Sequence, residues 1–148
     1  MKNYPTEAQI QMLREGLQGH HLESMLLLAL DLGLRRDELR HLTWAEVDLE
    51  KGEISVLNSK KKSHVRCMNL PENVAHALSK HALCQKERNR NADTTKRYPD
   101  LVFPDGVGEE LSTQRFLQEW SAVCEQVGLP YLCFHNLRIL WCREKLGV

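Results

Sequence analysis

The side chains best suited to chemistry are basic, and they lie in three segments that are far apart in the chain. Arginine grips a phosphate with two donors, lysine is a compact proton donor, and histidine titrates near neutrality. Gathered around one pocket, such groups would stabilise the charge that collects on a phosphodiester during its transfer. No carboxylate or histidine cluster has the spacing of a metal site. The three segments contain Arg35; Lys60, Lys61 and Lys62 with His64 and Arg66; and His135 with Arg138.

Arg35 follows the first of two predicted helices. The apolar run over residues 25–32 is typical of a buried helix, and Gly33 ends it because glycine readily adopts the left-handed conformation. A second, short helix is predicted from about residue 36. Glu38 comes three residues after Arg35, so its carboxylate is placed to hold the guanidinium. The alternative is an Arg–Glu surface pair, which contributes little to stability.

The second basic segment lies in a region whose pattern is typical of strands. Ile54 and Val56 alternate with polar residues, residues 59–63 form a polar hairpin tip, and residues 65–70 return as a second strand. We therefore predict a small antiparallel sheet near residues 46–70. The alternative for the lysines is a solvated turn that only protects an edge strand.

The third basic segment opens the last predicted helix, which runs from Phe134 to Leu146. His135 and Arg138 are three residues apart, so they share a face of that helix. The pattern His-x-x-Arg also occurs by chance on purely structural helices. From the residues alone, the convergence of the three segments is a hypothesis.

The other predicted elements complete one mostly helical domain. Thr6 and Gln9 form a capping box ahead of a helix, and Pro71 opens another that reaches about Cys84. The polar residues 85–96 are typical of an exposed loop. A further helix starts after Ser112 or Thr113 and reaches about Val127. The inward positions predicted in these two later helices are Val74, Leu78 and Leu83, and then Phe116, Leu117, Trp120, Val123 and Val127.

Composition sets limits on partners and location. The chain has 148 residues, and its 20 basic and 20 acidic residues give a net charge of zero, so DNA binding would need local clustering of basic groups. No apolar run is long enough to cross a membrane, and the N-terminus carries no targeting pattern. The odd cysteine count, with no C-x-x-C pair, indicates reduced thiols in a cytoplasm. The cysteines are Cys67, Cys84, Cys124, Cys133 and Cys142.

Residues 33–48 resemble the first catalytic box of the tyrosine recombinases, the phage integrase family. The shared pattern is Gly-Leu-Arg-x-x-Glu-Leu-x-x-Leu-x-Trp-x-x-Val-Asp, matched without gaps. The second box, His-x-Leu-Arg, is met by residues 135–138, with Asn136 in place of the usual Asp and Ile139 where a polar residue is common. The family's hairpin lysine corresponds to Lys60 when the Ser-Lys start is matched, and to Lys61 when counting back from Arg66.

The resemblance implies an α+β fold, mostly helical with a small antiparallel sheet, and a site for duplex DNA. Arg35 and Arg138 would clamp the scissile phosphate, and His135 would donate a hydrogen bond to it or shuttle a proton. Lys60 or Lys61 would protonate the departing 5′ oxygen, and Glu38 would orient the first box. Lys62, His64 and Arg66 would bind DNA nearby. A tyrosine would form a 3′-phosphotyrosine link without a metal or nucleotide cofactor.

The sequence departs from the family at the nucleophile. Its tyrosines are Tyr4, Tyr98 and Tyr131, and none follows the His-x-x-Arg box. We therefore expect residues 1–148 to be a catalytic domain that is incomplete at the C-terminus, lacks the N-terminal core-binding domain, and is monomeric and inactive alone. The full-length protein, of a bacterium or a phage, would be a tetramer on DNA. The alternatives are a non-catalytic DNA-binding or regulatory remnant, and a protein-interaction module.

Overall fold

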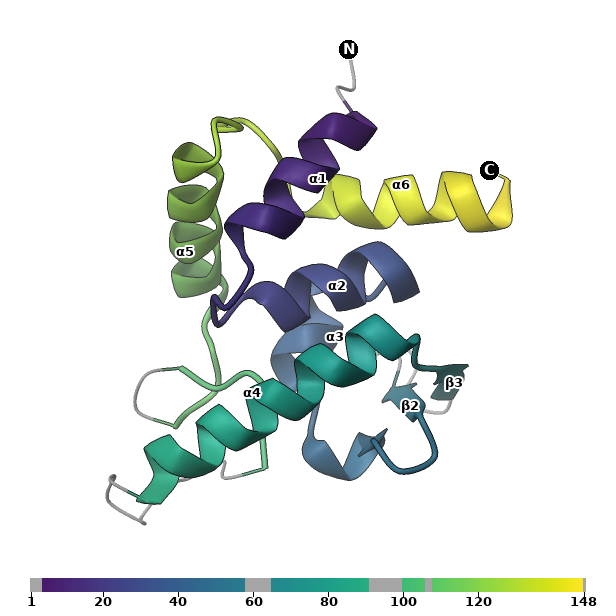
Figure 1. Ribbon diagram of the computed structural model, residues 1–148, viewed down its shortest axis with the longest axis vertical. Helices are drawn as coiled ribbons and strands as arrows, with labels where there is room; N and C mark the ends of the chain where they lie inside the picture. Colours follow the sequence, from purple (N-terminus) through teal and green to yellow (C-terminus); the bar gives the residue numbers. More distant parts are fainter. Residues whose placement is uncertain (1–3, 58–64, 91–99, 106–107, 148) are drawn as a thin grey trace. The chain divides into compact units, whose positions relative to one another are not determined.

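The computed structural model of this chain describes residues 4–57, 65–90, 100–105 and 108–147. The prediction of a mostly helical fold with a small antiparallel sheet is confirmed (Figure 1). In chain order the elements are α1 (Glu7–Gly16), α2 (Glu23–Leu32), α3 (Arg36–His41), the 3-10 helix η1 (Trp44–Glu46), β1 (Val47–Asp48), β2 (Glu53–Leu57), β3 (Val65–Asn69), α4 (Glu72–Arg90), α5 (Thr113–Gln126) and α6 (His135–Leu146).

The chain divides into two compact units. The first contains the described residues of 1–35 and 113–148, and therefore α1, α2, α5 and α6. The second contains the described residues of 36–112, with α3, the sheet and α4. Within the described ranges, no helix is both long and apolar enough to cross a membrane.

In the first unit, α1 begins with the predicted capping box. The backbone N–H of Gln9 donates to Thr6 Oγ1 over 3.2 Å, and the backbone N–H of Thr6 donates to Gln9 Oε1 over 2.8 Å. Two free N–H groups of the helix start are satisfied in this way. Gly16, at the end of α1, packs closely against Val127. A Cβ built on Gly16 would lie only 2.3 Å from the valine Cγ1. A glycine is required there for close approach of the two segments.

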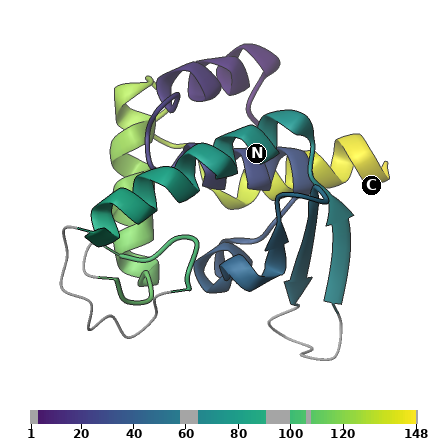
Figure 2. The ribbon, with the colours of Figure 1, turned by 60° about the horizontal axis from the view of Figure 1, so that its bottom comes forward.

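The remaining helices of the first unit enclose its core. Helix α2 is buried along almost its whole length, as its continuous apolar run predicts, and α6 packs alongside it (Figures 1 and 2). Phe116 and Trp120 of α5 meet the ring of Phe134 edge-on, with ring centroids 4.9 and 5.0 Å apart. The indole N–H of Trp120 donates to the Leu132 carbonyl over 2.9 Å. These contacts fix the chain just before α6 begins.

The face predicted for α5 is partly wrong. Leu117 was expected inside, but 45% of it is exposed, and Cys124 is buried in its stead. The buried set of Phe116, Trp120, Val123 and Cys124 has the spacing i, i+4, i+7, i+8 of a single helix face, and residue 117 lies about 100° away from residue 116 around the axis.

The second unit contains the antiparallel sheet in the order β1-β2-β3. Val47 pairs with Ile54, and Val56 pairs with Arg66. Ile54 and Val56 are buried, as their alternation predicts. Figure 2 shows β2 and β3 running side by side in opposite directions. The strand pairing fixes which residues of β3 share a face.

Helix α4 is longer than predicted. The polar run from Gln85 was expected to be a loop, but the helix continues to Arg90. Gln85 explains the difference, because its Oε1 accepts from the Trp44 indole over 2.7 Å and its Nε2 donates to the Leu101 carbonyl over 2.8 Å. The residues that follow are mostly strong helix formers, so a tertiary anchor is enough to extend the helix. Leu83, expected inside, is 64% exposed.

Candidate functional site

The first basic segment is positioned by the end of α2. Gly33 adopts the left-handed conformation at φ 69°, and its N–H donates to the Ala29 carbonyl over 3.1 Å. The N–H of Leu34 then donates to the Leu28 carbonyl over 3.3 Å, which satisfies a further carbonyl of the helix end. Leu34 is fully buried and Arg35 is exposed. The turn therefore anchors its backbone through leucine and presents arginine to solvent.

The third basic segment comes directly to that turn. Arg138 Nη1 of α6 donates to the carbonyl oxygen of Gly33, although the two residues are 105 positions apart. A cation at this carbonyl is favoured, because the C-terminus of α2 carries the negative end of the helix dipole. Gly33 and Arg35 are two residues apart, so the backbone atoms that carry them lie within about 7 Å. The two arginines of the predicted site thus come from adjoining pieces of one unit.

His135 opens α6, one turn before Arg138. Its side chain is exposed, whereas Arg138 is partly buried. Residues three apart on a helix have Cβ atoms about 5–6 Å from each other, so the imidazole belongs to the same face as the guanidinium. Phe134 and Leu137 on either side are buried and hold this first turn of α6 in place.

Glu38 has an ion-pair partner that sequence reasoning did not predict. Its carboxylate is buried, with 1% of the side chain exposed, and Arg66 Nη2 donates to Oε1 and Oε2 over 2.8 and 2.7 Å. Arg66 is one-third exposed. Period-two alternation places Arg66 and Met68 on one face of β3, but it does not indicate which residue that face meets. Within the second unit, this pair joins β3 to α3.

The remaining members of the predicted site cannot be placed. Lys60, Lys61, Lys62 and His64 all lie outside the described residues. The roles assigned to them, including the choice between Lys60 and Lys61, stay predictions.

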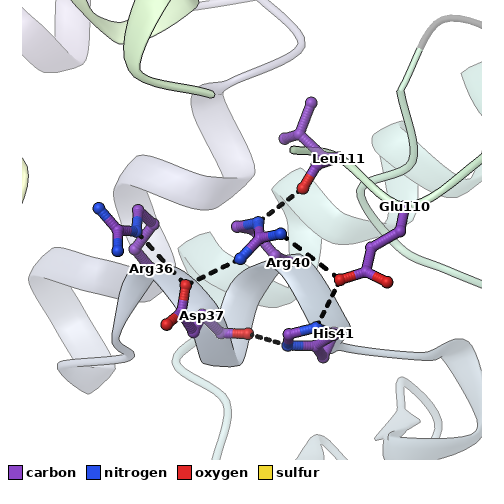
Figure 3. A network of polar contacts seen from close by, with 6 residues as sticks. All are labelled: Arg36, Asp37, Arg40, His41, Glu110 and Leu111. Atoms are coloured by element: carbon purple, nitrogen blue, oxygen red, sulfur yellow. Dashed lines mark hydrogen bonds and ion pairs between the residues drawn. The ribbon is translucent and has the colours of Figure 1, made fainter. Parts of the chain in front are cut away.

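A further polar network holds α3 in the second unit, and sequence reasoning missed it. Arg40 donates through Nε to the Leu111 carbonyl over 2.6 Å and through Nη1 to Asp37 over 2.9 Å (Figure 3). Its Nη2 lies 3.4 Å from Glu110 Oε1, and His41 Nε2 lies 2.6 Å from the same oxygen. No local pattern indicated the contacts with Glu110 and Leu111, because these residues are some 70 positions from Arg40 and His41. The network fixes the helix that carries Glu38.

Charge and burial shift the pKa values of three titratable groups among the residues that the structure describes. Desolvation alone would raise the pKa of Asp37, but the hydrogen bond from Arg40 and the charge of Arg36 outweigh it, so the pKa lies below its ordinary value. Burial, aided by the charge of His21, lowers the pKa of His20. Burial alone raises the pKa of the Cys124 thiol to about 11.

Chemically, the described residues can hold an anion. Two guanidiniums of the first unit come from adjoining backbone, and an imidazole lies one helical turn from one of them. Arginine and histidine donors of this kind stabilise phosphate oxygens. Within the described ranges, no group of three His, Cys, Asp or Glu side chains is arranged to hold a metal ion.

The chain is 27% identical over 161 residues to the "Tyrosine recombinase XerC-like" protein of Caldanaerobacter subterraneus subsp. tengcongensis, a match that covers 90% of this chain and 40% of the relative. The chain therefore spans less than half of that protein's length.

Solved structures share the fold. The crystal structure of XerA recombinase matches with a TM-score of 0.81 at 20% identity, over 99% of this chain and 51% of that one. The Tn1549 transposon integrase, solved with transposon right end DNA, matches with a TM-score of 0.80 at 20% identity, over 99% and 54%. A lambda integrase dimer bound to a COC′ core site matches with a TM-score of 0.69 at 18% identity, over 99% and 43%.

At these identities the solved structures show the fold alone, and the family rests on the sequence. The model of the phage integrase family matches residues 5–144, which include both arginine boxes and nearly all of the described elements. This chain belongs to the phage integrase family, the tyrosine recombinases.

Proposed function

We propose that this chain is the catalytic region of a site-specific recombinase that cuts and rejoins duplex DNA through a phosphotyrosine intermediate in the complete protein. The observation that carries the proposal is the hydrogen bond from Arg138 to the Gly33 carbonyl, which joins the second arginine box to the turn that bears the first. Neither box by itself distinguishes a phosphate site from an ordinary structural arginine. Their meeting in one unit supports the former.

In this proposal Arg35 and Arg138 hold the non-bridging oxygens of one phosphate, where negative charge builds up during transfer. His135 donates a hydrogen bond to that phosphate or shuttles a proton. Lys60 or Lys61 gives a proton to the departing 5′ oxygen. A tyrosine oxygen attacks phosphorus, and the new 3′-phosphotyrosine bond keeps the energy needed for rejoining.

The relatives support DNA as the partner. The Tn1549 integrase and the lambda integrase dimer were both solved with DNA. The net charge of zero argues for a local contact rather than a broadly basic surface, with Arg35, Arg138, Lys62, His64 and Arg66 as its candidate cations. We propose that the complete protein acts as a tetramer on DNA in the cytoplasm, and that the polypeptide of residues 1–148 is a monomer.

The polypeptide of residues 1–148 is expected to bind DNA without cutting it. Tyr4, Tyr98 and Tyr131 all precede the second arginine box, whereas the family's nucleophile follows it. Incubation with labelled duplex, denaturation and electrophoresis should reveal no covalent protein–DNA band. A covalent band that disappears when Tyr4, Tyr98 or Tyr131 is replaced by Phe would contradict this expectation.

Binding itself is tested by titrating a fluorescein-labelled duplex at several salt concentrations. Each phosphate contact contributes about −0.9 to the slope of log K against log salt. Arg35→Ala and Arg138→Ala should each weaken binding and make the slope shallower by about one. Arg115→Ala is the matched control, since Arg115 is an exposed arginine of the same unit, on α5, and it should change neither quantity.

The same titration distinguishes the DNA-binding functions from a protein-interaction module. A non-catalytic DNA-binding remnant would bind in the same way, so it differs only in the chemistry of the complete protein. A protein-interaction module would show negligible binding at both low and high salt. That result would overturn the proposed function.

A further inference from the structure

Gly33 is in direct contact with Trp141 of α6. A Cβ built on Gly33 would lie 2.4 Å from Cδ2 and Cε3 of the indole and 3.0 Å from Cε2. Real Cβ atoms do not approach rigid ring carbons so closely, so the ring packs on the bare α carbon. The left-handed φ of 69° independently favours glycine at this position.

Trp141 also contacts Arg138, one helical turn earlier. The guanidinium carbon lies 5.5 Å from the centroid of the indole ring, within the range of a cation–π interaction. Arg138 in turn donates to the carbonyl of Gly33. The three residues therefore form a closed set of contacts, in which each touches the other two. We call this set the Gly33–Arg138–Trp141 triangle.

We propose that Trp141 is a positioning residue, which holds the guanidinium of Arg138 against the Gly33 carbonyl and so fixes its place beside Arg35. This inference rests on the proposed function, because it gives Arg138 a phosphate to hold. Arginine has a long and flexible side chain, and a planar guanidinium that is already oriented loses less freedom on binding. The indole face supplies the orientation without itself touching DNA.

The competing role for Trp141 is that of a filler between α2 and α6. A filler needs bulk and apolar character, whereas a positioning residue needs an aromatic face. Trp141→Leu keeps most of the apolar bulk and removes the ring, and Trp141→Phe keeps a ring. These two substitutions separate the roles, and both are milder than Trp141→Ala, which risks unfolding the helix pair.

The experiment is a double-mutant cycle in DNA affinity on the full chain. A fluorescein-labelled duplex is titrated at low salt with the wild type, Arg138→Ala, Trp141→Leu, the double variant and Trp141→Phe. Arg138→Ala should weaken binding about tenfold, the loss expected for one charged hydrogen bond. Trp141→Leu should weaken it about three- to fivefold and Trp141→Phe less than about twofold. The double variant should bind no more weakly than Arg138→Ala.

Two outcomes would overturn the inference. If Arg138→Ala weakens binding but Trp141→Leu binds like wild type, the ring does not act on Arg138. Additive losses in the double variant would show that it acts by another route. Circular dichroism and urea unfolding of each variant identify any loss that comes from unfolding.

Failure of the proposed function gives a different pattern. If Arg138→Ala binds DNA like wild type, the phosphate role of Arg138 is lost, and the triangle is then tested by the same cycle in urea unfolding. If the stability losses of Arg138→Ala and Trp141→Leu are not additive in that cycle, Trp141 is still the residue that orients Arg138. No coupling in either measurement rejects the inference itself.

Discussion

Both carboxylate oxygens of Glu38 accept hydrogen bonds from Nη2 of Arg66, so a buried anion of α3 is neutralised by a cation of β3. Glu38 is 1% exposed at its side chain, which makes the unpaired carboxylate costly. The pair assigns Arg66 a structural duty within the second unit.

Removing Arg66 should therefore be more harmful than removing an ordinary surface arginine. We expect Arg66→Ala to lower the free energy of unfolding by about 3 kcal/mol, because the Glu38 carboxylate loses this ion pair while it stays buried. Glu38→Gln in the same chain should recover part of the loss, since the amide carries no charge. Arg88→Ala, an exposed arginine of α4 in the same unit, should change stability by less than about 0.5 kcal/mol. Urea unfolding measures the three variants beside the wild type. Equal losses for Arg66→Ala and Arg88→Ala would contradict the structural role.

The Gly33 turn offers a comparison between two left-handed glycines. Gly33→Ala should cost about 3 kcal/mol, because alanine strains the backbone and its Cβ meets Trp141. Gly52 has nearly the same φ, 68°, and nothing within 4 Å of its Cβ position, so Gly52→Ala should cost only about 1 kcal/mol. Thermal unfolding of the two variants measures the difference. If they unfold alike, Trp141 does not pack on Gly33 as described.

Gln85 should be necessary for the last turns of α4. Gln85→Ala leaves the Trp44 indole and the Leu101 carbonyl without the side-chain partner they now have, and we expect a loss of about 1–2 kcal/mol. Lys86→Ala, its exposed neighbour on the same helix, should stay within about 0.5 kcal/mol of wild type. Hydrogen exchange should also quicken at residues 86–90 in the Gln85 variant alone. Unchanged exchange there would show that the helix extends without this anchor.

Acid should remove the contribution of Asp37. Its pKa is lower in the folded chain than its ordinary value of 3.8, so the folded state favours the ionised form. The resulting stability is present above the unfolded pKa and is lost as the pH falls through the folded pKa. The stability difference between wild type and Asp37→Asn should thus be constant near neutrality and shrink below about pH 4. Urea unfolding between pH 7 and pH 3 measures it, and a difference that grows in acid would contradict the Arg40–Asp37 network.

Local patterns predicted those parts of the fold that short segments determine. The apolar run ending at Gly33 predicted both the buried helix and the turn before Arg35, and the alternation of Ile54 and Val56 predicted strand β2. Each depends on backbone preferences or periodicity over a few residues. For that reason the positions of these elements were right to within a few residues.

Tertiary partners were out of reach of the same reasoning. Nothing in the polar run after Gln85 indicated that its side chain would bind both Trp44 and Leu101 and extend the helix. The pairing of Arg66 with Glu38 depends on the strand register, and the contact of Arg138 with Gly33 on the packing of α6 on α2. The resemblance to the family identified Arg35 and Arg138 as site residues. The contacts that hold this part of the site, such as that of Arg138 with the Gly33 carbonyl, became visible only in the structure.

The account depends on two arginines acting on one phosphate, and a double-mutant cycle at residues 35 and 138 tests it most directly. Affinity for a labelled duplex at low salt is measured for Arg35→Ala, Arg138→Ala and the double variant, with urea unfolding as a check on folding. If both guanidiniums grip the same phosphate, each single variant loses about tenfold and the double variant loses clearly less than the product of the two losses. Losses that multiply in full, or no loss in either single variant, would contradict a shared phosphate site.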